Sequence, residues 1–237
     1  MSNIPEPTAW PEIVSQEEWE AARLEHLKTE KALTRMRDAV SASRKRLPMV
    51  EITTPYEFDG ENGKVTLLDL FDGHRQLILQ HFMFHPDWDA GCDGCSMMAD
   101  HVGPLAHMRA RDTTYVAVAR APLAKLLPFR ERMGWEIPFY SSCGTSFNED
   151  FGVTVNDEED QGVSFMVRDG DRVFRTGFNG GRGVEDAIST FGLLDHTVFG
   201  RQEEFEDSPA GWPKTEMYSW WRLHDEYQND TDGGHCH

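Results

Sequence analysis

The first long pattern in the chain is a stripe of mainly apolar residues spaced alternately three and four positions apart, which lies on one face of an α-helix. A capping-box pattern, Ser15 followed by Glu18, precedes the stripe, and Pro48 follows it. We therefore expect a helix from Ser15 to about residue 45. His26 and Thr29 weaken the stripe as a coiled-coil seam, which favours packing on its own domain over a dimer interface. The stripe consists of Trp19, Ala22, His26, Thr29, Leu33, Met36 and Val40.

Alternating apolar positions and β-branched runs predict strands in the middle of the chain, with helices between them. The predicted strands are residues 50–58, 64–68, 76–84, 113–119, 136–141, 163–167 and 173–176, and the predicted helices are 95–110, 122–134 and 183–191. This order predicts an α/β fold with a mixed central sheet flanked by helices. It divides the chain into an N-terminal arm and helix (1–48), a central domain (49–200) and a C-terminal arm (201–237).

Composition and charge narrow the range of functions. Among 237 residues, 23 are Lys or Arg and 41 are Asp or Glu, which gives a net charge of −18. Such a charge repels phosphates, so nucleic acid and anionic membranes are excluded as main partners. The chain starts without a signal-peptide pattern, and no apolar run approaches the roughly 18 residues of a membrane span. We therefore expect a cytoplasmic protein. The four cysteines are too few for a disulfide scaffold in a chain of this length.

Two of the cysteines, Cys92 and Cys95, have the spacing of a redox-active or metal-binding pair. They follow a predicted buried strand and begin a predicted helix. The free amides and the dipole at a helix N-terminus stabilise a thiolate, so Cys92 can attack a disulfide and Cys95 can resolve the product. Gly91 and Gly94 would let the backbone of a partner approach closely. Two ligands of a zinc site and an incidental pair are the alternatives, and the position in the fold favours redox chemistry.

Motifs on both sides of the pair resemble an uncharacterised thioredoxin-like family, domain of unknown function 899, described as predicted dithiol–disulfide oxidoreductases. The stretch 63–73, followed by 76–84 and the pair, is similar to the opening of a peroxiredoxin or thioredoxin-like domain. The family motifs cover about residues 15–227 and read HFMF (81–84), DW (87–88), GCDGCS (91–96), AD (99–100), ARAPL (119–123), RMGW (132–135), SS (141–142), FNEDFG (147–152) and WWRLHDEY (220–227).

The resemblance implies a thioredoxin-like fold with an N-terminal helical extension and a C-terminal wrapping arm. It also implies a dithiol–disulfide oxidoreductase with Cys92 as nucleophile and Cys95 as resolving thiol, which requires no cofactor. Arg120 ends the strand after the cysteine helix, where it is expected to stabilise the thiolate or orient an acidic substrate. An ordinary surface arginine is the alternative. Asp87 and Trp88 are expected to bind substrate at the rim of the pair.

The expected partners are a small-molecule or protein thiol or disulfide substrate and an external reductant, and a homodimer is left open. The aromatic segment 212–227 is expected to cover part of the core or the mouth of the active site. Two local departures limit the resemblance. No proline stands in residues 160–164, where thioredoxins carry a cis-proline that keeps metals from the thiols. Asp89 stands where peroxiredoxins carry a threonine, so the local residues do not support peroxide reduction.

The histidines and the C-terminus point to the alternative function, a copper- or zinc-binding protein or metalloenzyme on the same fold. Mixed imidazole and thiolate ligands suit either metal. A tail folded back on the pair would supply part of the site, whereas a disordered terminus would supply none. Cys143 is expected either close to the pair or as a small buried side chain. A relative with vestigial thiols is the third interpretation. The candidate ligands are Cys92, Cys95, His85, His235, Cys236 and His237.

Overall fold

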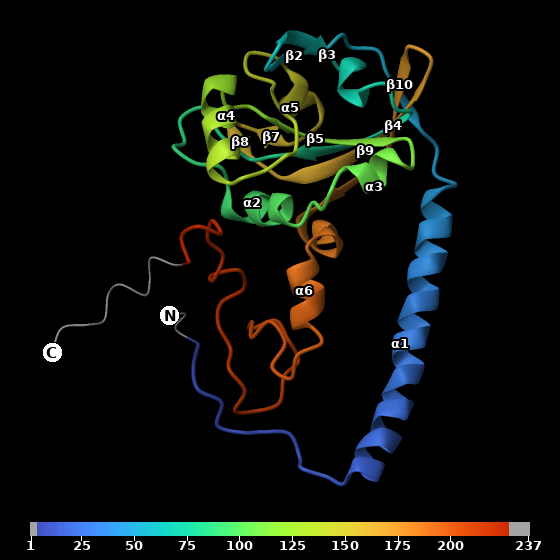
Figure 1. The fold of residues 1–237 in the computed structure, drawn as a ribbon, viewed down its shortest axis with the longest axis vertical. Coiled ribbons are helices and arrows are strands. Elements are labelled where there is room, and N and C mark those ends of the chain that lie inside the picture. Colours follow the sequence, from blue (N-terminus) through green and yellow to red (C-terminus); the bar gives the residue numbers. More distant parts are fainter. Residues whose placement is uncertain (1–3, 228–237) are drawn as a thin grey trace, which may run out of the picture.

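The computed structural model describes residues 4–227, which form an eight-stranded mixed sheet and a separate two-stranded hairpin (Figure 1). Across the sheet, the strands are β1 (Val50–Ile52), β10 (Arg172–Gly180), β9 (Gly162–Asp169), β4 (Gln76–His81), β5 (Thr113–Ala119), β6 (Phe139–Ser141), β2 (Glu57–Gly60) and β3 (Gly63–Thr66). The hairpin consists of β7 (Thr154–Val155) and β8 (Glu158–Glu159). The helices are α1 (Gln16–Arg44), α2 (Asp93–Asp100), α3 (Ala106–Arg109), α4 (Leu123–Arg132), α5 (Phe147–Asp150) and α6 (Ser189–Leu194), with 3-10 helices η1 (Asp69–Phe71) and η2 (Gly181–Ala187).

The connectivity of the central strands is that of the thioredoxin fold. β4 and β5 are parallel and joined through α2, which places the cysteine pair directly after β4. β9 pairs antiparallel with β4, β10 pairs antiparallel with β9, and α6 follows β10. The central order is therefore β10-β9-β4-β5, with β6, β2 and β3 added beyond β5 and β1 added beyond β10. The predicted thioredoxin-like fold is confirmed.

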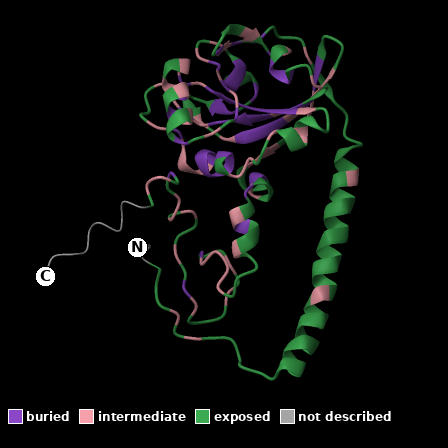
Figure 2. Cartoon of the chain, viewed as in Figure 1, coloured by how far each residue is buried: buried purple, intermediate pink, exposed green. Residues whose placement is uncertain are grey.

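Helices cover both faces of the sheet, so the core consists of two apolar layers. Alternate residues of β5 point to opposite faces. Val116 and Val118 pack with Phe147 of α5, whereas Ala117 packs in the cluster that contains Ala99 of α2. Accordingly, α2 and α5 lie on opposite sides of the sheet in Figure 1, and the buried residues concentrate around it in Figure 2. The cysteine pair thus starts a helix whose inner face is fixed against the sheet.

Three predicted elements are divided in the structure. The predicted strand 50–58 is two separate strands: β1 forms one edge of the sheet, and β2 lies next to β3 at the other edge. Pro55 between them lacks the amide hydrogen that pairing in a sheet requires. The predicted helix 95–110 is α2 followed by α3, because Gly103 and Pro104 interrupt it. The predicted helix 183–191 is η2 followed by α6. α5 and the β7–β8 hairpin have no counterpart in the sequence prediction.

The start of α1 is as predicted, but its packing is not. The Ser15 side chain accepts a hydrogen bond from the Glu18 amide, and the Glu18 carboxylate accepts one from the Ser15 amide at 3.0 Å, which confirms the capping box. No residue of α1 is buried, and Leu33 and Met36 are 52% and 63% exposed. The prediction that the stripe packs on its own domain is therefore wrong. Other elements already cover the sheet, and the polar positions in the stripe leave α1 little apolar surface to bury.

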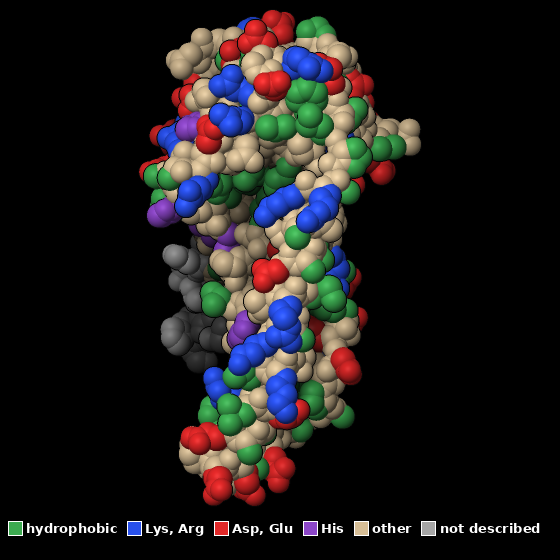
Figure 3. Space-filling view, turned by 90° about the vertical axis from the view of Figure 1, so that its right-hand side faces the viewer, with side chains coloured by type: hydrophobic (Ala, Val, Ile, Leu, Met, Phe, Trp, Pro, Cys, Tyr) green, Lys and Arg blue, Asp and Glu red, His purple; other side chains and the backbone are tan. Residues whose placement is uncertain are grey.

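α1 stands beside the domain as an extended arm (Figures 1 and 2). Lys and Arg side chains are prominent along the face of α1 that Figure 3 shows. One contact with the domain is an ion pair between Arg37 and Asp186 of η2, at 3.8 Å. None of the helices in residues 4–227 combines the length and the hydropathy of a membrane-spanning segment.

The C-terminal arm, residues 201–227 of the described chain, runs beside the N-terminal segment and then returns to the domain (Figure 1). Thr8 donates its amide to the carbonyl of Gly211 at 2.8 Å. At the far end, Leu223 is buried in the same cluster as α2 and α4, and Arg132 of α4 donates two hydrogen bonds to Asp225, at 2.7 and 2.9 Å. The predicted C-terminal wrapping arm is confirmed.

Candidate active site

The cysteine pair lies at the N-terminus of α2. Cys92 is the N-cap residue, its carbonyl accepts the Ser96 amide at 2.9 Å, and its own amide donates to the carbonyl of Met83 at 3.0 Å. The first bond begins the helix and the second ties the helix start to the chain that leaves β4. Cys92 is partly exposed, whereas Cys95, one turn into the helix, is only 4% exposed. Neither cysteine is in a disulfide within residues 4–227.

Buried polar groups hold Cys95 in place. The Met83 amide donates to its sulfur at 3.4 Å, and the Gln80 side chain donates to its carbonyl at 3.0 Å. The side-chain oxygen of Gln80, Oε1, accepts a hydrogen bond from the Tyr115 hydroxyl at 2.9 Å. Gln80 and Tyr115 were missed as part of the site by sequence reasoning. The available signal was that Gln80 interrupts the apolar run of β4, because a buried amide needs hydrogen-bond partners.

The two thiols ionise over different pH ranges. The hydrogen bond from Cys95, assisted by the amides of Cys95 and Gly94, lowers the pKa of Cys92 to about 7, against the opposing effects of burial and of Asp93. The same hydrogen bond, followed by burial, raises the pKa of Cys95 well above that of an ordinary thiol. Near neutral pH, Cys92 is therefore the thiolate of the pair and Cys95 keeps its proton.

A cavity of about 220 Å³ adjoins the pair. Four parts of the chain line it: α2, the segment before β9, the η2–α6 region and the C-terminal arm. Gln161 lies in this lining, next to the position where thioredoxins carry their proline, and residues 4–227 contain no cis peptide bond. The apolar part of the lining includes Met98, Val184, Ile188 and Phe191, and the C-terminal arm contributes Tyr218 and Trp221.

Trp221 of the C-terminal arm lies directly over Gly94, between the two cysteines in sequence. A Cβ atom at position 94 would come within 2.3 Å of the Trp221 ring. Gly94 is thus required for a close approach, but the approaching group is the protein's own indole and not the backbone of a partner. Gly91 has a similar role, because a Cβ there would come within 2.4 Å of the Phe82 ring.

Arg120 is held by carboxylates of the β7–β8 hairpin. Its guanidinium donates to Asp157 and to Glu159, both at 2.6 Å, and the Glu159 side chain is only 1% exposed. The arginine thus fixes the hairpin to the end of β5. The structure shows these ion pairs around Arg120, and its predicted role in catalysis stays a prediction.

Asp87, Trp88 and His85 lie in the loop between β4 and α2. Asp87 and Trp88 are exposed, and Lys125 of α4 donates to the carbonyl of Trp88 at 2.9 Å. His85 accepts the Asp87 amide at 3.0 Å and lies 3.5 Å from the carboxylate of Asp157. The loop is therefore tied to α4 and to the β7–β8 hairpin. The substrate-binding role predicted for Asp87 and Trp88 stays a prediction.

The proposed metal ligands do not gather within the described chain. Residues 4–227 contain no group of three or more His, Cys, Asp or Glu side chains placed to hold a metal ion. Cys143 is a free, partly buried thiol just after β6, and its amide donates to the Ser141 hydroxyl at 3.2 Å. The predicted ligands of the tail, His235, Cys236 and His237, lie outside the described residues.

The family of the chain follows from its sequence. The profile of a family described as "Bacterial protein of unknown function (DUF899)" matches residues 8–227. The chain belongs to this family. The resemblance drawn from the motifs is confirmed, and no curated protein matches this DUF899 chain.

Among solved structures, the DUF899 chain is similar to peroxidoxin BcpB from Mycobacterium tuberculosis, with 19% identity, 62% of this chain and 97% of that chain covered, and a TM-score of 0.46. It is also similar to a PrxQ mutant from Xylella fastidiosa, with 13% identity, coverage of 58% and 88%, and a TM-score of 0.42. A reduced 2-Cys peroxiredoxin from Plasmodium vivax gives 14% identity, coverage of 63% and 94%, and a TM-score of 0.41.

Proposed function

We propose that this DUF899 protein is a dithiol–disulfide oxidoreductase in which Cys92 attacks and Cys95 resolves. The observation that carries the proposal is the asymmetry of the pair. Cys92 is partly exposed at a helix N-terminus with its pKa lowered to about 7, whereas Cys95 is buried with its pKa raised. A thiolate attacks only when it is both ionised and accessible, and Cys92 alone of the two meets both conditions.

The reaction exchanges one disulfide for another. The Cys92 thiolate attacks one sulfur of the substrate, the substrate's S–S bond breaks, and the leaving thiolate takes a proton. The Cys95 thiol then gives up its proton, and its sulfur attacks the Cys92 sulfur and releases the second substrate thiol. The substrate gains two electrons and two protons, and the protein keeps a Cys92–Cys95 disulfide. A dithiol reductant resets the pair by the reverse exchange, which suits a reducing compartment such as the cytoplasm.

Mixed-disulfide trapping tests these roles. With Cys95→Ser, the second step is lost, so a small disulfide should leave a stable adduct on Cys92 that mass spectrometry detects. With Cys92→Ser, no adduct should form at Cys95 on the same timescale, because the Cys95 sulfur is buried and protonated. An adduct rate at Cys95 equal to that at Cys92 would contradict the proposed roles. Cys143→Ser is the matched control, because it removes a thiol outside the pair.

The copper or zinc alternative is tested on protein purified without chelators. The dithiol proposal expects two titratable thiols at the pair and no bound metal. Near-stoichiometric copper or zinc that is lost in Cys92→Ser would overturn the simple redox function and assign the pair to a metal site. A variant truncated after residue 227 would then show whether His235, Cys236 and His237 contribute to binding.

A further inference from the structure

Much of the lining of the cavity beside the cysteine pair is apolar. Val184 of η2, Ile188 before α6 and Phe191 of α6 line the same volume of about 220 Å³ as the pair, and Phe191 and Ile188 are almost fully buried. Sites for drug-sized ligands measure about 300–1,000 Å³. The space beside Cys92 therefore fits the substituent of a small molecule. Its apolar surface favours a substituent without charge.

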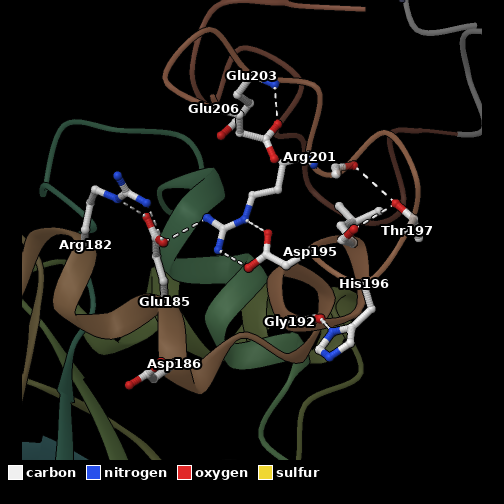
Figure 4. A network of polar contacts seen from close by, with 12 residues as sticks. Arg182, Glu185, Asp186, Gly192, Asp195, His196, Thr197, Arg201, Glu203 and Glu206 are labelled. Carbon is white, nitrogen blue, oxygen red and sulfur yellow. Dashed lines mark hydrogen bonds and ion pairs between the residues drawn. The ribbon is translucent and has the colours of Figure 1, made fainter. Parts of the chain in front are cut away.

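The charged side chains that line the cavity, Arg182 and Glu185, are already paired with each other and with neighbouring groups. Arg182 donates to Glu185 at 2.9 and 3.3 Å, and Arg201 donates to the same carboxylate at 2.8 Å and to Asp195 (Figure 4). The Tyr218 hydroxyl also donates to Glu185. Two arginines and two carboxylates make this network neutral. A charged ligand would lose its hydration in the cavity without gaining a free counter-charge from these groups.

Trp221 closes the cavity on the side of the C-terminal arm. Its ring packs against Tyr218 in a tilted arrangement, with centroids 4.0 Å apart, and stacks on Phe191, at 5.8 Å. Its indole nitrogen is buried with no hydrogen-bond partner in the described chain, whereas the neighbouring Trp220 donates to Glu203 at 2.8 Å. Trp221 is therefore held by packing. An unsatisfied buried N–H costs about 1–3 kcal/mol, and this cost is relieved when the indole moves toward water.

The indole also occupies the surface that a protein substrate would need. Trp221 covers Gly94 and lines the cavity beside Cys92, so the backbone of a folded partner cannot lie against Gly94 while the indole is in place. A small disulfide can instead place one substituent in the cavity and present its sulfur to the thiolate.

From these observations we infer that the substrate class is small, uncharged disulfides with an apolar substituent, and that Trp221 determines this specificity. The inference rests on the proposed dithiol function. It names the substrate for the first attack, in which the Cys92 thiolate displaces one half of the disulfide as a thiol.

The test compares three small aliphatic disulfides of similar size: neutral dipropyl disulfide, dianionic dithiodipropionate and dicationic cystamine. The reduced full-length protein is mixed with each, and the rate of Cys92–Cys95 disulfide formation is divided by the rate of the same reagent with dithiothreitol. Cystamine is the decisive comparison, because the net charge of −18 attracts a dication and works against the expected order. We expect the neutral disulfide to react about tenfold faster than either ion after this normalisation.

Trp221→Ala should reduce this preference to about twofold or less and increase the rate with insulin, a protein substrate that carries disulfides. Trp212→Ala is the matched control, because Trp212 lies in the same arm but packs on Phe199, with centroids 5.2 Å apart. The control should keep the wild-type preference.

Equal normalised rates for the three disulfides in the wild type, or a rate with insulin as high as with dipropyl disulfide, would overturn the inference. These wild-type measurements decide the question even if Trp221→Ala fails to fold. If no disulfide oxidises the pair although Cys92 alkylates readily, the proposed function itself fails, and that outcome is distinct from a loss of selectivity.

Discussion

Replacing Cys95 by Ala tests the physical origin of the Cys92 thiolate. The largest contribution that lowers the pKa of Cys92 is the hydrogen bond from Cys95. Alanine removes this donor and fills most of the same buried space, and the backbone amides of residues 94 and 95 remain. The pKa of Cys92 should therefore rise from about 7 toward the ordinary thiol value of about 8.5, because burial and Asp93, which raise it, are then opposed by the amides alone.

The magnitude depends on two opposing effects. At pH 6.5, the thiolate fraction is about one quarter for a pKa of 7 and about 1% for a pKa of 8.5. The fraction of Cys92 present as thiolate therefore falls by up to about 25-fold. A more basic thiolate is a better nucleophile, and a Brønsted slope of about 0.45 returns about fivefold over this range. The variant should therefore react about fivefold more slowly at pH 6.5. At pH 9.5, where Cys92 is ionised in both the wild type and the variant, the variant should react about four- to fivefold faster.

The assay is alkylation by iodoacetamide, a neutral reagent, between pH 5.5 and pH 10, with the modified Cys92 peptide quantified by mass spectrometry. The two rate profiles should cross between the two pKa values. Cys143→Ala is the control and should reproduce the wild-type profile. A midpoint that stays near 7 in Cys95→Ala would refute the reasoning and assign the low pKa to the helix N-terminus alone.

Three further predictions follow from other contacts. Ser15→Ala should fray about one turn of α1, which would appear as a loss of far-UV circular dichroism signal. The midpoint of the main unfolding transition should not change, because α1 buries no residue. Ser43→Ala is the control, and a lower midpoint in Ser15→Ala would show that α1 does pack on the domain. Gly94→Ala should lower the free energy of unfolding, measured in urea, by about 1–3 kcal/mol, because the new Cβ meets Trp221. Gly103→Ala is the control and should leave the free energy of unfolding unchanged, because the space around Gly103 is open. Equal effects of the two substitutions would refute the close contact between Gly94 and Trp221. Arg120→Met should cost about 3–5 kcal/mol of stability, because Glu159 is left buried without its cation. An increase in the pKa of Cys92 in that variant would support the catalytic role predicted for Arg120.

The parts of the fold that were predictable from the sequence are those set by local chemistry. The capping box at Ser15 needs residues three positions apart, and the strand–cysteine–helix order needs only the apolar pattern and the turn residues around it. The division of the helix 95–110 was also present in the sequence, at Gly103 and Pro104. Periodicity on both sides outweighed these two residues in the prediction, although a proline after a glycine is the stronger signal.

The remaining features depend on contacts between distant positions. Trp221 reaches Gly94 across 127 positions, and Arg120 meets Asp157 across 37, so no local pattern identifies either partner. The apolar stripe of α1 shows a second limit of predictions from hydrophobic periodicity. The pattern gives the face of a helix correctly but does not say whether anything covers it, because that depends on the faces left open elsewhere in the fold.

An acidic protein has an electrostatic difficulty in forming a thiolate, because negative neighbours raise the pKa of a thiol, as Asp93 does for Cys92. The structure overcomes this with neutral donors, the Cys95 thiol and two backbone amides, which act at contact distance and are little screened by salt. Arg182, which lines the cavity, and Arg201, which shares its partner Glu185, are both paired with carboxylates. An unpaired cation there would lower the pKa of Cys92 equally well, but it would also attract anionic disulfides. The way in which the thiolate is stabilised and the preference for an uncharged substrate are therefore two consequences of one arrangement of charges.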